Sequence, residues 1–148
     1  MTGSQILESL IYSTRHAASF VLRRMRRVPP AGLYFVNAEE PRMDYYFPRE
    51  DDRAASEQEL RRLVEEKVRR WAARPETCAV AFVTEILVDG QRVMAVQAET
   101  RTQVVVLHYP IRKTWLGWKL GEAREAEGLL VARLLDGDPV REGSDRAP

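Results

Sequence analysis

The sequence predicts an α+β fold, built as an antiparallel sheet of about five strands with helices packed mainly on one face. Apolar residues recur at helical spacing in two segments and alternate in three consecutive segments, which turn-forming residues separate. At 148 residues with 45% hydrophobic content, the chain has the size of one domain around one core. We expect this domain over residues 1–135, in the order helix, hairpin, helix, three-stranded meander and a terminal strand or helix.

The first expected helix spans residues 4–27, where apolar side chains from Leu7 to Met25 form one stripe at helical spacing. Pro29 and Pro30 end it, because proline cannot continue a helix. The last turn carries a cluster of four arginines: Arg23, Arg24, Arg26 and Arg27. Their charges either complement the negative end of the helix dipole or bind an anion such as phosphate.

A short hairpin follows, with strands at 32–36 and 43–47, because aromatic and β-branched residues flank a polar turn. The hairpin is rich in tyrosine, with Tyr34, Tyr45 and Tyr46. Two interpretations stay open for these rings. Either they cover the core with their hydroxyls in water, or they form a platform on which bases or a ligand stack.

The second expected helix, 56–74, has clear signals at both ends. Ser56 and Glu59 form a capping box, and Pro75 stops the helix. Apolar residues between Leu60 and Trp71 make its buried stripe. We interpret its charged face as a solvated helix face.

Three strands of a meander are expected at 77–88, 91–99 and 102–111. The Asp89-Gly90 pair signals a type I′ hairpin between the first two, and Thr100-Arg101 marks the next turn. The first and third strands are apolar on both faces, so we expect them to be central and covered.

The last part of the chain is less regular. Residues 115–120 alternate and predict a short strand. Residues 122–135 are rich in helix formers and favour a helix, although Gly128 at their centre costs about 1 kcal/mol relative to alanine. A strand at 129–135 is the alternative. Residues 136–148 contain almost no apolar side chain, which predicts a flexible tail.

Composition excludes several classes of function. With 23 basic and 22 acidic residues the net charge is +1, so there is no global basic excess that would drive non-specific binding to nucleic acid or membranes. The sole cysteine, Cys78, excludes an internal disulfide and a cysteine-based metal cluster, and fits a reducing cytoplasm. No apolar run approaches the ~20 residues of a membrane span, and no signal peptide is expected. Arginine supplies 20 of the 23 basic residues, a bias typical of GC-rich bacterial genomes.

Metal, cofactor and nucleophile signals are weak. His16 and His108 have no sequence neighbour that would complete a metal-ligand pair, so we expect both in the core or at its rim. Cys78 lies in an apolar strand, where a reactive thiolate is not expected. The sequence therefore predicts no metal and no cofactor.

One arrangement offers catalytic chemistry. Glu85 precedes the hairpin turn, and Glu99 and Arg101 follow it. Two carboxylates across a hairpin could hold Mg²⁺ while a cation stabilises the transition state. This order resembles that of PD-(D/E)xK nucleases, which implies metal-dependent cleavage of nucleic acid. The chain departs from that pattern, because Arg101 replaces the usual lysine and Thr102 leads into a strand. Ordinary solvent-face pairs of a hairpin are the alternative interpretation.

A second hypothesis is single-stranded nucleic-acid binding. Cations contact phosphates while aromatic faces stack on bases. Near the end of the chain, cations alternate with indoles in Arg112, Lys113, Trp115, Trp118 and Lys119. These five residues and the four arginines of the first helix are the candidate binding residues. The alternative is that the two tryptophans pack in the core.

The order of elements resembles that of the small profilin-like and roadblock-like folds, which implies a dimerising or scaffolding module. A long amphipathic helix and an aromatic hairpin are good self-association surfaces, and no complete catalytic set is present. The sequence therefore favours a non-enzymatic protein-interaction or scaffolding module that forms a homodimer or binds another protein, without a membrane partner. Nucleic-acid binding and the nuclease are the alternatives.

Overall fold

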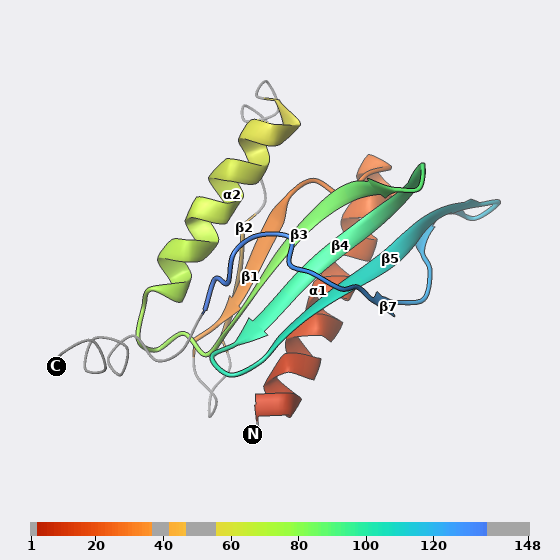
Figure 1. Ribbon diagram of the computed structural model, residues 1–148. Helices are drawn as coiled ribbons and strands as arrows, with labels where there is room; N and C mark the ends of the chain where they lie inside the picture. The colour runs from red at the N-terminus through yellow and green to blue at the C-terminus, as the bar shows by residue number, and fades with distance from the viewer. Residues whose placement is uncertain (1–2, 37–41, 47–55, 136–148) are drawn as a thin grey trace, which may run out of the picture.

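The computed structural model describes residues 3–36, 42–46 and 56–135, and they form two helices and an antiparallel sheet (Figure 1). The α+β class and the order of elements are confirmed. The predicted tail at 136–148 lies outside the described residues. The elements are α1 (Gly3–Met25), β1 (Ala31–Phe35), β2 (Met43–Tyr46), α2 (Glu57–Ala72), β3 (Ala79–Val88), β4 (Gln91–Thr100), β5 (Val104–Thr114), β6 (Gly117–Leu120) and β7 (Arg124–Glu125).

The sheet has the strand order β2-β1-β3-β4-β5-β6, with β7 paired to β5. Every pairing is antiparallel, and the predicted meander forms β3, β4 and β5. Between β3 and β4 the chain turns at Asp89 (φ 51°) and Gly90 (φ 78°). Positive φ at both central residues is what a type I′ hairpin requires, so this turn signal is confirmed.

The two helices lie on opposite faces of the sheet, and our prediction that they pack mainly on one face is wrong. On one face, α1 packs against Leu33, Ala81 and Met94. On the other, α2 packs against Val80 and Phe82, and in Figure 1 only α1 runs behind the strands. Successive strand residues point to opposite faces. A strand that is apolar on both faces, as β3 is, therefore needs cover on both.

Residues 126–135, which we call the C-terminal strap, form neither a helix nor a strand. The predicted helix at 122–135 and the alternative strand at 129–135 are both wrong. Gly128 has a φ of +83°, outside the helical region. The strap instead crosses the α2 side of the sheet (Figure 1), and its Leu134 and Leu135 join the core beneath α2.

Two buried polar side chains of β4 hold the strap in place. The Glu99 carboxylate, 0% exposed, accepts hydrogen bonds from Arg133 Nε at 2.7 Å and from the amides of Leu134 (3.0 Å) and Leu135 (3.0 Å). Gln97 Oε1 accepts from the amides of the strap residues 130 and 131, and Gln97 Nε2 donates to Glu99 at 2.8 Å. We call this the Gln97–Glu99 clamp.

A close approach of α2 to the sheet gives the first testable prediction. A Cβ atom at Gly32 would lie 2.3 Å from Val68 Cγ2 and 3.3 Å from the Trp71 ring. We expect Gly32→Ala to lower the free energy of unfolding by about 1–3 kcal/mol, because α2 must move off the sheet. Urea denaturation measures this change. Gly3→Ala is the control, since no atom lies within 4 Å of its added methyl group, and equal stability of the two variants would contradict the packing.

Candidate functional site: a basic and aromatic surface

The arginines at the end of α1 and the tryptophans of the β5–β6 hairpin meet at one end of the molecule. Arg92, at the start of β4, joins them. Its Nη2 donates to the backbone oxygen of Arg26 at 2.8 Å, and its guanidinium lies 4.7 Å from the centre of the Trp118 ring. Lys113 Nζ lies 5.8 Å from the same ring. Arg92 therefore links the end of α1 to the β5–β6 hairpin, which follows about ninety residues later in the sequence.

We define the basic–aromatic surface by residues of the elements that meet here, namely the end of α1, the start of β4 and the β5–β6 hairpin: Arg23, Arg24, Arg26, Arg92, Lys113, Trp115 and Trp118. Three predicted members lie elsewhere. Arg112 and Lys119 are register partners on the opposite face of the β5–β6 ribbon. Arg27 is turned into an ion pair with Glu57, with Nη1 3.3 Å from Oε2.

The tip of the β5–β6 hairpin presents an indole to solvent. Trp115 is 93% exposed and its neighbour Leu116 is 61% exposed. Thr114 fixes the turn, because its Oγ1 accepts from the Leu116 amide at 3.2 Å and donates to the Gly117 carbonyl at 2.9 Å. The core-packing interpretation thus applies to Trp118, which packs against the core beside α1, and not to Trp115.

An aromatic row on the outer face of α1 leads toward this surface, and the sequence analysis missed it. Tyr12 is 71% exposed and Phe20 is 53% exposed, with His16 between them, also exposed and 6.2 Å from the Tyr12 ring in a stacked geometry. Arg24 continues the row, 5.5 Å from the centre of the Phe20 ring. Spacing by four places these residues in line along a helix. That spacing was the signal available in the sequence.

The surfaces that suggested self-association are used inside the protomer. The apolar stripe of α1, with Leu10 and Leu22 fully buried, packs against its own sheet. Tyr34 is buried with its ring centre 4.5 Å from that of Trp71, so it is a core residue and no platform. For Tyr45 and Tyr46 the structure describes the backbone, in β2, and their side chains lie outside the described residues.

Glu85 is paired with Arg92, a member of the basic–aromatic surface, and its charge is compensated. Both of its oxygens accept from Arg92, at 2.7 and 2.9 Å, and Oε1 also accepts from the Val28 amide at 3.0 Å. Burial opposes ionisation of this carboxyl, but these hydrogen bonds and the charges of Arg92 and Arg27 outweigh it. The pKa of Glu85 therefore lies below its ordinary value.

The acids of the nuclease hypothesis are not brought together. Glu85 faces the α1 side of the sheet, whereas Glu99 faces the α2 side and is closed off in the Gln97–Glu99 clamp. Arg101 donates to the backbone oxygens of residues 74 and 77. Among the residues that the structure describes, no three His, Cys, Asp or Glu side chains lie so as to hold a metal ion. The resemblance to nucleases thus ends at the order of residues.

The remaining nucleophile and histidine candidates lie outside any described cavity. Cys78 is half-buried, with Sγ 3.5 Å from the Phe35 carbonyl oxygen. Burial raises the pKa of this thiol, although a backbone hydrogen bond and the charge of Arg101 act against it, so the thiolate is disfavoured. His108 lies half-buried on β5, in register with Arg124 of β7.

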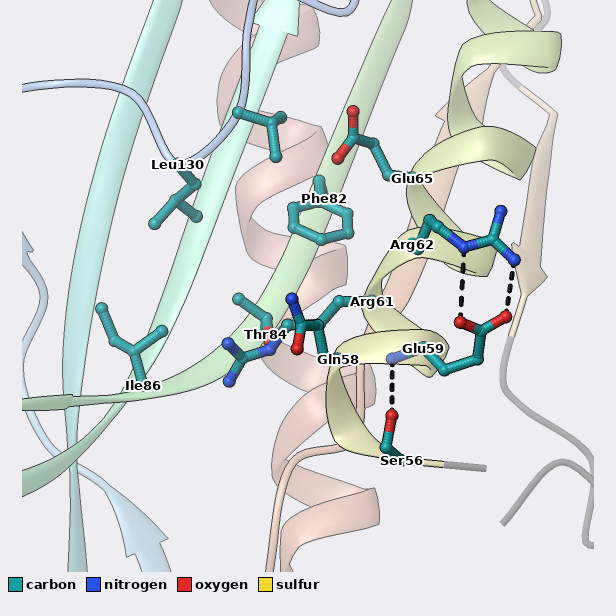
Figure 2. A pocket seen from close by; sticks show the side chains of 11 residues that line it. Ser56, Gln58, Glu59, Arg61, Arg62, Glu65, Phe82, Thr84, Ile86 and Leu130 are labelled. Atoms are coloured by element: carbon teal, nitrogen blue, oxygen red, sulfur yellow. Dashed lines mark hydrogen bonds and ion pairs between the residues drawn. The ribbon is translucent and has the colours of Figure 1, made fainter. Parts of the chain in front are cut away.

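A cavity of about 470 Å³ opens between α2, β3 and the C-terminal strap, at a place the sequence did not indicate (Figure 2). Thr84 and Arg61 line it, and each carries a buried polar atom without a hydrogen-bond partner among the described residues. The sequence held one hint, because Thr84 interrupts the apolar side chains on its face of β3. Arg61 could not be told apart in the sequence from the other charged residues of the same helix.

The Glu85 ion pair gives a pH-dependent prediction. A carboxyl whose folded-state pKa is depressed contributes stability above its unfolded pKa of about 4.3 and loses it as the pH falls through the folded value. Glu85→Gln should therefore lower the free energy of unfolding by about 1–2 kcal/mol at pH 7, with the difference shrinking below about pH 4. Urea titrations across pH 3–7 measure it. The exposed Glu76→Gln is the control, and a gap between wild type and Glu85→Gln that is independent of pH would refute the assignment.

No helix in the described part of the chain is long and apolar enough to cross a membrane. Comparison of the chain with protein-family models, with curated proteins and with solved structures finds no match.

Proposed function

We propose that this protein is a non-enzymatic binding module that holds single-stranded nucleic acid on its basic–aromatic surface. The observation that carries the proposal is the link that Arg92 makes between the arginine-rich end of α1, through the Arg26 carbonyl, and Trp118 of the β5–β6 hairpin. Cations supply phosphate contacts, and an exposed indole supplies a stacking face that accepts any base.

The charges on this surface are available for such contacts. Arg23, Arg24 and Lys113 are exposed, and no carboxylate within the described residues forms an ion pair with them. The charge of Glu85, which pairs with Arg92, is compensated by that arginine. A strand that passes over Trp115 would thus meet positive charge on both flanks. A net charge near zero makes the attraction local rather than global.

The proposal predicts binding that depends on salt and on Trp115. Fluorescence anisotropy of a labelled oligothymidylate should show binding at 20 mM salt that weakens at 150 mM. Trp115→Ser should weaken binding by about tenfold, the effect of losing one base-stacking contact. The double substitution Arg23→Gln and Arg24→Gln should reduce the slope of log affinity against log salt by about 1.4, since each lost phosphate contact contributes about 0.7.

Matched controls come from exposed residues outside the surface. Leu129→Ser tests the loss of an exposed apolar side chain, and Arg70→Gln tests the loss of an exposed arginine on α2. Neither should change the affinity. The proposal fails if the protein does not bind at either salt concentration, or if the control variants lose as much affinity as the surface variants. Equal affinity for a double-stranded oligonucleotide would also remove the stacking role of Trp115.

We further propose a cytoplasmic location and retain the homodimer as a proposal. The single half-buried cysteine supports a reducing compartment. A homodimer would have to form through surfaces left open by the protomer, and the apolar tip of Trp115 and Leu116 is one of them.

A further inference from the structure

The cavity between α2 and the C-terminal strap is separate from the basic–aromatic surface, because it lies on the α2 side of the sheet. Phe82, Thr84 and Ile86 of β3 form its floor, with Leu130 of the strap on one side and α2 on the other (Figure 2), and Val131 of the strap lines it as well. Its volume of about 470 Å³ falls in the range of pockets that bind small molecules. Most of the floor and the strap side are apolar, because Phe82, Ile86, Leu130 and Val131 form them.

Two polar atoms in this apolar setting have unmet hydrogen-bonding capacity. Thr84 is 3% exposed, and its Oγ1 is buried without a partner among the described residues. The same is true of Arg61 Nε. These two are the buried side-chain polar atoms of the described chain that lack a partner. Leaving such a group unpaired costs about 1–3 kcal/mol, which something entering the cavity can recover.

The guanidinium of Arg61 is anchored at the edge of the cavity by a hydrogen bond. Its Nη2 donates to the backbone oxygen of Glu85 at 2.5 Å, which restrains the guanidinium group. An arginine Nε–H can only donate, and a threonine hydroxyl can donate as well. The group that satisfies both is therefore a hydrogen-bond acceptor, such as an oxygen atom of a ligand.

Charge favours an anionic acceptor. Two glutamates line the cavity, but Glu59 is paired with Arg62 and Glu65 with Arg69. Figure 2 shows the Arg62 and Glu59 pair turned away from Thr84. Arg61 is the lining cation that has no carboxylate partner within the described residues. A carboxylate supplies two acceptor oxygens and a negative charge that would balance Arg61, whereas a water molecule can accept hydrogen bonds but carries no charge.

We infer that this cavity binds a small monocarboxylate with an apolar body. Its carboxylate accepts from Arg61 Nε and from the Thr84 hydroxyl, while its apolar part packs on Phe82, Ile86 and the strap residue Leu130. The strap is one wall of the site, so a bound ligand also holds the strap against the sheet.

Octanoate is the probe for this inference, measured by isothermal titration calorimetry. Octanol, which has the same apolar body without the charge, and acetate, which has the charge without the body, are the ligand controls. We expect octanoate to bind more tightly than either. In the methyl NMR spectrum, octanoate should shift the signals of Ile86, Leu130 and Val131, which reports the site without any substitution.

Two variants test the polar contacts. Thr84→Val keeps the shape of the side chain and should weaken octanoate binding by about five- to tenfold. It should leave the melting temperature of the unliganded protein unchanged or higher, because it removes an unpaired buried hydroxyl. Arg61→Gln should weaken binding by at least about tenfold. The matched control is Arg70→Gln, an exposed arginine on the same helix outside the cavity.

Each other outcome overturns the inference. Absence of octanoate binding at millimolar concentration, with the protein folded, removes the site. Binding that Thr84→Val and Arg61→Gln leave unchanged, or that shifts none of the three methyl signals, places the ligand elsewhere. Octanol binding as tightly as octanoate removes the carboxylate from the recognised chemistry.

Discussion

The fold depends on a buried carboxylate. Glu99 has no contact with solvent, and a charge in that position persists only where donors surround it. Gln97 Nε2 of the same strand is one of those donors, and the others, Arg133 and the amides of Leu134 and Leu135, come from the C-terminal strap. The carboxylate therefore requires the strap, and the strap gains from it the hydrogen bonds that an irregular backbone lacks. Gln97 repeats this arrangement one step along the same face of β4.

The clamp also explains how the two faces of the sheet differ. On the α1 side one long helix covers the strands, and the exposed end of that helix meets the β5–β6 hairpin through Arg92. On the α2 side the helix is shorter and lies over β1 and β3, so the strap completes the cover. The cover is not closed, and the cavity with Thr84 on its floor is the space that remains. The basic–aromatic surface and the proposed carboxylate site thus lie on opposite sides of the sheet.

Local signals in the sequence predict most elements of this fold, and they fail where distant side chains decide the structure. The Ser56 cap is present, with its Oγ accepting from the Glu59 amide, and the Asp89-Gly90 turn adopts its predicted form. Residues 126–135 have helical composition, but Glu99 competes for their amides from thirty-odd residues away. The sequence of the strap alone does not show that Glu99 will bind its amides, so it does not predict the loss of the helix. The two apolar faces of β3 do imply that α1 and α2 lie on opposite faces of the sheet.

The candidate sites show the same division. The arginine and tryptophan clusters were visible as composition, but Arg92, which joins them, had no signal of its own. Thr84 and Arg61 acquire meaning only when β3 and α2 are side by side. The most direct test of the central claim is amide hydrogen exchange across the strap. The account predicts that the amides of residues 130, 131, 134 and 135 exchange far more slowly than those of Glu127 and Leu129, which the clamp does not bind. Uniform, fast exchange over residues 127–135 would contradict it.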